Sequence, residues 1–121
     1  MSRIILTKHD DGSDHIVVGY DRAMATFYWQ EFNREPDWDS LTEEEAEQWI
    51  EMAGYGGYEP GEIVTTRQLF DVASAPVKIA LLEHAGDHAI DAPTVFEILN
   101  EHKTLEYPQS NVIVDLSQRS K

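Results

Sequence analysis

The chain has 121 residues, of which 41% are apolar and twelve are aromatic, and its 23 acidic and 9 basic side chains give a formal net charge of −14. This length suits one compact domain spanning residues 1–121, and the aromatic content excludes a disordered chain. The lack of cysteine excludes a disulfide framework, thiol catalysis and thiolate metal sites. The N-terminal residues show no signal-peptide pattern and no apolar run reaches membrane-spanning length, so we expect a soluble, cytoplasmic protein without a membrane partner.

The strong negative charge restricts the kind of partner. Binding of nucleic acid requires clustered Lys and Arg that neutralise phosphates, so we expect no direct contact with DNA or RNA. The same electrostatic field accelerates encounter with a basic partner. Proteins that hold nucleic acid are the natural basic partners in a cell, and we therefore expect a basic nucleic-acid-binding protein or complex as the partner.

Three strands are predicted at the start of the chain. Residues 3–7 and 15–20 are β-branched runs on either side of an Asp-Gly pair, which predicts a β-hairpin in which Gly12 has a positive φ. Residues 26–32 are rich in aromatic side chains and predict a third strand that pairs with the second.

Two motifs in the chain resemble a known family. They are the run VVGYDR with the following TFY, at residues 17–28, and the run GEIVT at residues 61–65. They resemble a family of small bacterial and plasmid proteins of uncharacterised function, whose pattern is VVGWDR, then TFF, then GEIPT. Val64 stands where that family tends to have proline, and the acidic segment between the motifs is longer than usual. The resemblance implies an order of elements and carries no activity. The matching positions are Val17, Val18, Gly19, Tyr20, Asp21, Arg22, Thr26, Phe27, Tyr28, Gly61, Glu62, Ile63, Val64 and Thr65.

The segment from residue 31 to residue 52 holds nine acidic side chains and a single cation. Residues 36–39 predict a turn, and the Ser40–Glu43 spacing predicts a capping box that opens a helix. Apolar residues at helical spacing from position 46 to position 53 predict that this helix is amphipathic. The glycine-rich residues 54–61 are expected to end it.

Further helices are predicted downstream. A Thr65–Gln68 capping box opens one helix, Ser74 caps the next, and Asp91 with Pro93 opens another. Residues 111–117 predict a strand that could join the N-terminal sheet. The expected fold class is α+β, with a small antiparallel sheet packed against three or four helices.

No constellation of catalytic residues stands out, and we expect a protein that is not an enzyme. Carboxylate pairs drawn from an acidic run carry little information about acid and base roles. His84 and His88 have a metal-like spacing, but Gly86 between them separates the imidazoles, so no metal and no cofactor is expected. A small hydrolase or metal protein that uses these histidines is the least favoured class.

Trp38 lies between two aspartates, outside the predicted helical stripe. One interpretation is a hydrophobic staple that packs on the following helix. The other is an aromatic anchor ringed by carboxylates that faces a basic groove.

Helix formation explains some of the remaining carboxylates of this segment and not others. Residues 43–45 suit the first turn of a helix, where the dipole favours anions, whereas Glu47 and Glu51 would form a like-charge i,i+4 pair. The predicted protein-binding residues are those that helix formation does not explain, namely Asp37, Trp38, Asp39, Glu47 and Glu51.

These features favour an acidic, non-enzymatic protein-binding module that mimics nucleic acid toward a basic partner. A phage or plasmid counter-defence inhibitor, directed at CRISPR or restriction machinery, is the concrete form of this hypothesis. The alternative is a structural or accessory protein of a mobile element, which could form a homodimer through the aromatic strand and whose acidity serves solubility alone.

Overall fold

The protein is built around a five-stranded mixed sheet, seen in a computed structural model that describes residues 2–85, 94–104 and 112–117. The strands lie in the order β4-β3-β2-β1-β5. They are β1 (Ser2–Lys8), β2 (Asp14–Asp21), β3 (Thr26–Phe32), β4 (Met52–Gly56) and β5 (Val112–Asp115). Within the described residues, their connections contain a 3-10 helix and four α-helices: η1 (Trp38–Ser40), α1 (Glu43–Gln48), α2 (Thr66–Val72), α3 (Ala75–Ala85) and α4 (Val95–Thr104). The predicted α+β class is confirmed.

The N-terminal half of the sheet follows the sequence prediction. Strands β1 and β2 form the antiparallel hairpin, Gly12 has a φ of +86°, and β3 pairs with β2 from Thr26 to Glu31. The C-terminal strand does join the sheet, but β5 runs parallel to β1. The sheet is therefore mixed, whereas an antiparallel one was expected.

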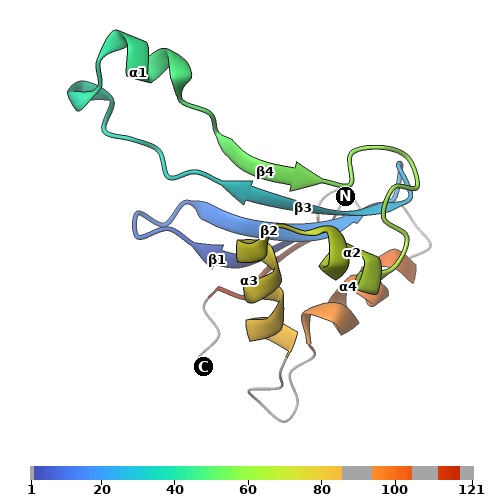
Figure 1. The fold of residues 1–121 in the computed structure, drawn as a ribbon. Helices are drawn as coiled ribbons and strands as arrows, with labels where there is room; N and C mark the ends of the chain where they lie inside the picture. Colours follow the sequence, from blue (N-terminus) through green and yellow to red (C-terminus); the bar gives the residue numbers. More distant parts are fainter. Residues whose placement is uncertain (1, 86–93, 105–111, 118–121) are drawn as a thin grey trace.

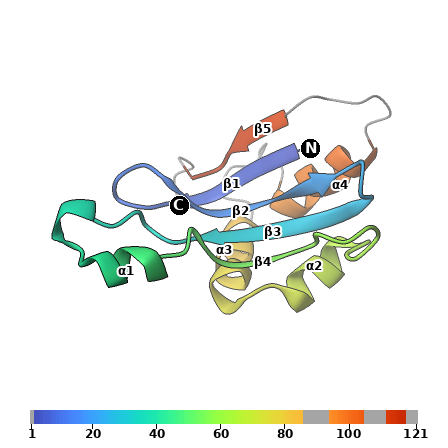
Figure 2. The ribbon, with the colours of Figure 1, turned by 90° about the horizontal axis from the view of Figure 1, so that it is seen from above.

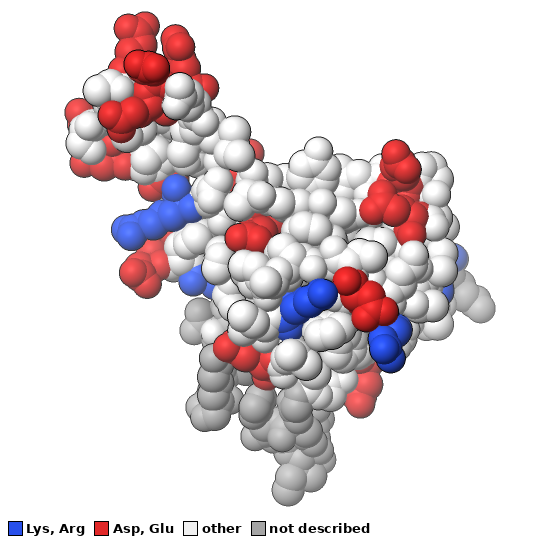
Figure 3. Space-filling view, viewed as in Figure 1, with Lys and Arg blue, Asp and Glu red and all other residues white. Residues whose placement is uncertain are grey.

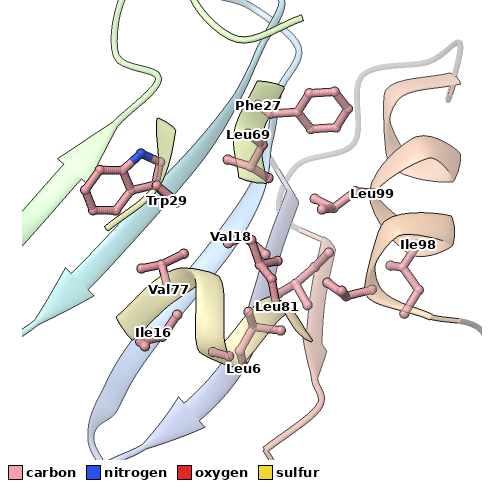
Figure 4. Packing of buried hydrophobic residues seen from close by; sticks show 14 of the residues in the cluster. Leu6, Ile16, Val18, Phe27, Trp29, Leu69, Val77, Leu81, Ile98 and Leu99 are labelled. Atoms are coloured by element: carbon pink, nitrogen blue, oxygen red, sulfur yellow. The ribbon is translucent and has the colours of Figure 1, made fainter. Parts of the chain in front are cut away.

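Helices α2, α3 and α4 pack on one face of the sheet and enclose the hydrophobic core (Figures 1 and 4). Phe27 and Val18 from the strands meet Leu69, Leu81 and Leu99 from the helices there, and all five side chains are fully buried. Apolar residues at helical spacing form the buried faces of the two longer helices. These residues are Val77, Ala80 and Leu81 in α3 and Val95, Ile98 and Leu99 in α4, joined by His84 and His102.

The predicted helix starts at Thr65 and Ser74 are confirmed. The Thr65 side chain accepts a hydrogen bond from the backbone N–H of Gln68, and the Gln68 side chain accepts one from the backbone N–H of Val64. Helix α3 begins directly after Ser74. Gly86, His88, Asp91 and Pro93, which the sequence analysis also singled out, lie outside the described residues.

The prediction for residues 52–56 was wrong, because this segment is strand β4 and not the end of a helix. Its glycines make room for Trp29 of the neighbouring strand. A Cβ atom at Gly56 would lie 2.3 Å from Trp29 Nε1, and one at Gly54 would lie 3.1 Å from the indole ring. Pairing with β3 and contact with this indole outweigh the apolar spacing that favoured a helix.

The face of the sheet opposite the helices has no described helix over it (Figures 1 and 2). Ile5, Val17 and Tyr28 are nevertheless buried there, in a small cluster beside Phe32. The Arg3 guanidinium lies over the Phe32 ring, 5.7 Å from its centroid. In the part of the chain that the structure describes, no helix combines the length and apolar character needed to cross a membrane.

Candidate functional site

The predicted binding segment forms a projection that we call the acidic arm, residues 33–51, which joins β3 to β4. The arm extends beyond the end of the sheet, away from the helices of the core (Figures 1 and 2). At its base the Asn33 N–H donates to the Glu51 carbonyl oxygen at 2.8 Å, and the Asn33 side chain donates to the Ile50 carbonyl oxygen at 3.0 Å. Neither η1 nor α1, the two helices of the arm, contains a buried residue.

Side-chain caps determine the local structure of the arm. Asp37 caps η1, because its carboxylate accepts from the Asp39 N–H at 3.2 Å. Thr42 caps α1, where its hydroxyl accepts from the Glu45 N–H at 3.1 Å and donates to the Glu45 carboxylate at 3.2 Å. The capping box is thus Thr42–Glu45, and the predicted box at Ser40 was wrong. The residues between the two caps leave the helical region, since Leu41 is extended.

The two tryptophans of the arm pack against each other. The rings of Trp38 and Trp49 meet edge to face, with centroids 5.2 Å apart. Trp38 also donates from Nε1 to the Glu35 carboxylate at 2.7 Å, yet its side chain remains 45% exposed. Trp38 therefore contacts the residue that ends the following helix, and not its first turn as a hydrophobic staple would, while part of its ring stays accessible.

The arm carries eight carboxylates and one cation, Arg34. Figure 3 shows these acidic side chains gathered on the projecting lobe. Arg34 lies 3.9 Å from Asp11 of the β1–β2 turn, so it is directed away from the arm. Among the described residues, no Lys or Arg forms an ion pair with a carboxylate of the arm. The arm therefore presents an uncompensated negative field to solvent.

The five predicted binding residues are all exposed, and the structure divides them into separate groups. Asp37, Trp38 and Asp39 lie together in and beside η1. Glu47 is in the last turn of α1, which ends at Gln48, and Glu51 lies in the base of the arm beside β4. Glu47 and Glu51 are therefore no helical i,i+4 pair, and the repulsion expected between them on that ground was wrong.

A pocket that sequence reasoning missed lies where the arm meets the sheet. Its volume is about 210 Å³, and it is lined by Arg3, Ser13, Asp14, Phe32, Asn33, Glu35, Trp49 and Glu51. The Arg3 guanidinium is bound by the Asp14 carboxylate at 2.5 Å and donates to Gln30 Oε1 at 3.3 Å. The pocket combines segments from the hairpin, β3 and the arm, and no local sequence pattern links them.

Two histidines connect the hairpin to the base of the arm. The rings of His9 and His15, which flank the β1–β2 loop, have centroids 4.5 Å apart. His9 Nε2 donates to the Phe32 carbonyl oxygen at 2.9 Å, and His15 Nδ1 is hydrogen-bonded to the Thr7 hydroxyl at 3.0 Å. Burial, and then the neighbouring His9, lower the pKa of His15 below its ordinary value. This link positions the hairpin turn against the arm.

His84, the other histidine singled out for its spacing, faces the core. Its Nε2 donates to the Leu6 carbonyl oxygen at 3.0 Å. Within residues 2–85, 94–104 and 112–117, no group of three or more His, Asp or Glu side chains is placed to hold a metal ion.

The fold and the acidic arm define the chain as a small α+β protein with a projecting, negatively charged insertion. Comparison with family models, with curated proteins and with solved structures finds no match. The resemblance to the plasmid protein family therefore stays a prediction.

Proposed function

We propose that this protein is a non-enzymatic binding module that uses the acidic arm to occupy the nucleic-acid site of a basic partner. The observation that carries the proposal is the concentration of eight carboxylates on a projecting segment, without a paired Lys or Arg among the described residues. Opposed charge of this kind accelerates association and selects basic partners.

The arm has little reason to exist for stability. Its helices bury no side chain, and ordering a segment of this length costs conformational entropy that buried contacts normally offset. The like charges add a further repulsion. Binding a cationic surface would relieve that repulsion, so the proposed function explains a feature that folding does not.

The concrete form of the proposal is an inhibitor of CRISPR or restriction machinery encoded by a phage or plasmid. Such machinery holds nucleic acid in grooves lined by Lys and Arg, which an acidic projection could fill. Trp38 supports the same reading, because a half-exposed tryptophan next to carboxylates is typical of an interface anchor.

Affinity capture from a nuclease-treated extract of the host tests the proposal. We expect the intact protein to retain a basic nucleic-acid-binding protein that is released at high salt and is displaced by DNA or RNA. Glu47→Lys combined with Glu51→Lys should weaken this binding by about tenfold or more. The matched control is Glu59→Lys with Glu101→Lys, which makes the same charge change at exposed sites outside the arm.

Equal binding by the two double variants would contradict a role for the arm. Simultaneous binding of nucleic acid and of this protein by the captured partner would contradict mimicry.

A second candidate is an accessory protein that pairs with its own copy. The aromatic strand β3 cannot supply the pairing edge, because β2 and β4 flank it on either side. The neighbouring strand β4 is at the edge of the sheet, and its Tyr55 has an exposed ring that contacts the exposed ring of Tyr58, with centroids 4.7 Å apart. Sedimentation equilibrium checks this candidate, since it requires a dimer that Tyr55→Ala weakens.

A further inference from the structure

The pocket at the base of the acidic arm has the chemistry of a cation site. Arg3, the cation within it, is already bound to Asp14, so its charge is compensated locally. Glu35 and Glu51 also line the pocket, and neither has an ion pair with a described Lys or Arg. The pocket therefore has two carboxylates in excess of the charge that it contains.

One of these carboxylates is held in place. Glu35 accepts a hydrogen bond from Trp38 Nε1 at 2.7 Å, which restrains its side chain. A carboxylate has several acceptor positions, so Glu35 can still bind a second donor. Glu51 is positioned through its backbone, because its carbonyl oxygen accepts from Asn33.

Aromatic rings form the other walls of the pocket. Phe32 and Trp49 both line it, and the Arg3 guanidinium already rests over Phe32. This contact shows within the same site how a planar cation packs on these walls. Trp49 also lines the pocket, and tryptophan is the side chain that attracts cations most strongly.

We propose that this pocket accepts an arginine side chain from the basic partner. Arginine suits it better than lysine, because a guanidinium stacks flat on an aromatic ring and donates in a planar fork to carboxylates. The inference rests on the proposed function and adds the point at which the partner is gripped. The outer part of the arm supplies long-range attraction, and the pocket selects the side chain.

A titration with short peptides tests the proposal. The probes are the capped peptides Ac-Arg-Arg-Arg-NH2 and Ac-Lys-Lys-Lys-NH2, added to the full chain and followed by the NMR signals of the indole N–H groups. We expect the Trp49 signal to shift, the buried Trp29 signal to stay in place, and the arginine peptide to bind more tightly than the lysine peptide.

Glu35→Gln with Glu51→Gln should weaken binding of the arginine peptide by about tenfold. The control is Glu43→Gln with Glu44→Gln, which removes the same charge from α1, outside the pocket lining, and should weaken binding by no more than about threefold. An unchanged spectrum of the core signals in both variants confirms that the fold is intact.

Absence of peptide binding, an unshifted Trp49 signal, or equal losses in the two double variants would overturn the pocket proposal. The proposed function is judged separately, by the captured partner. Partner binding that is weakened by Glu47→Lys alone, while Glu35→Gln with Glu51→Gln has no effect, would remove the pocket and leave the acidic arm as the binding element.

Discussion

Removing the acidic arm should leave the rest of the protein folded. In the variant that we consider, residues 33–51 are replaced by an Asn-Gly pair that joins Phe32 to Met52 in a tight hairpin turn. Phe32 and Met52 are already partners in the ladder between β3 and β4, so the sheet needs no new register. The replacement also removes eight carboxylates and one guanidinium and so halves the net charge of −14.

The expected change in stability can be worked from loop length and lost contacts. Shortening the connection from nineteen residues to two lowers the entropy cost of closing the loop by about 2 kcal/mol. The Arg34–Asp11 pair is exposed and stabilises the fold by less than about 1 kcal/mol. Trp49 lines the pocket together with Arg3 and Phe32, and its contacts there are lost as well, at about 1 kcal/mol. The variant should therefore equal the intact protein in its free energy of unfolding or exceed it by up to about 2 kcal/mol.

Urea denaturation measures this difference. The chain has three tryptophans, of which Trp38 and Trp49 lie in the arm, so fluorescence of the variant reports on Trp29 in the core. Far-UV circular dichroism provides a second probe of the same transition. A loss of more than about 2 kcal/mol, or failure to fold, would refute the view that the arm is an attachment on a self-sufficient sheet.

Further predictions concern the core and its edge. Gly56→Ala should destabilise the protein by about 1–3 kcal/mol, because the new Cβ would lie 2.3 Å from Trp29 Nε1; a Tm equal to that of the parent would contradict the close contact. Leu81→Ala should cost about 3–5 kcal/mol, since this side chain is fully buried between α3 and the sheet, and a cost under about 1 kcal/mol in urea denaturation would show that the site is looser than described. Burial lowers the pKa of His102 below its ordinary value of 6.5, and its Nδ1 has no hydrogen-bond partner among the described residues. His102 is protonated more readily in the unfolded chain than in the folded protein. Its contribution to the free energy of unfolding is therefore complete at neutral pH, and it is lost as the pH falls from 6.5 toward the folded-state pKa. His102→Gln should flatten that fall, and an unchanged pH profile of the Tm would rule out His102 as a source.

Elements with a strong local pattern could be predicted from the sequence. The hairpin and β3 follow from β-branched and aromatic runs around an Asp-Gly turn, and β3 has the bounds that were expected. The buried faces of α3 and α4 follow from apolar residues at helical spacing, including Leu81 and Leu99. In these segments local propensity and the final packing agree.

Strand β4 could not be predicted, because its conformation depends on a distant residue. Apolar side chains from position 46 to position 53 match a helical period by chance, and the glycines that follow resemble a helix end. Trp29 gives these glycines their role, since its indole lies where their side chains would be. A pattern confined to the segment does not contain that contact.

The candidate site was predictable only in part. The charge of the arm and the two interpretations of Trp38 can be derived from the sequence. The sequence does not show that Asp37, Trp38 and Asp39 lie in the outer part of the arm while Glu51 lies at its base. Glu35 and Glu51 become neighbours of Arg3 only when β3, β4 and the hairpin turn are assembled. Sequence reasoning therefore found the charged segment and missed the pocket.

The hydrogen bond between Asn33 and Glu51 closes the arm at its base, so the segment enters and leaves the sheet at nearly the same point. The segment between these two positions can change in sequence or in length without altering the pairing of β3 with β4. Under the proposed function, such a chain would change its target through one contiguous stretch of coding sequence while the core remains constant. Each new arm is then tried on a scaffold that already folds.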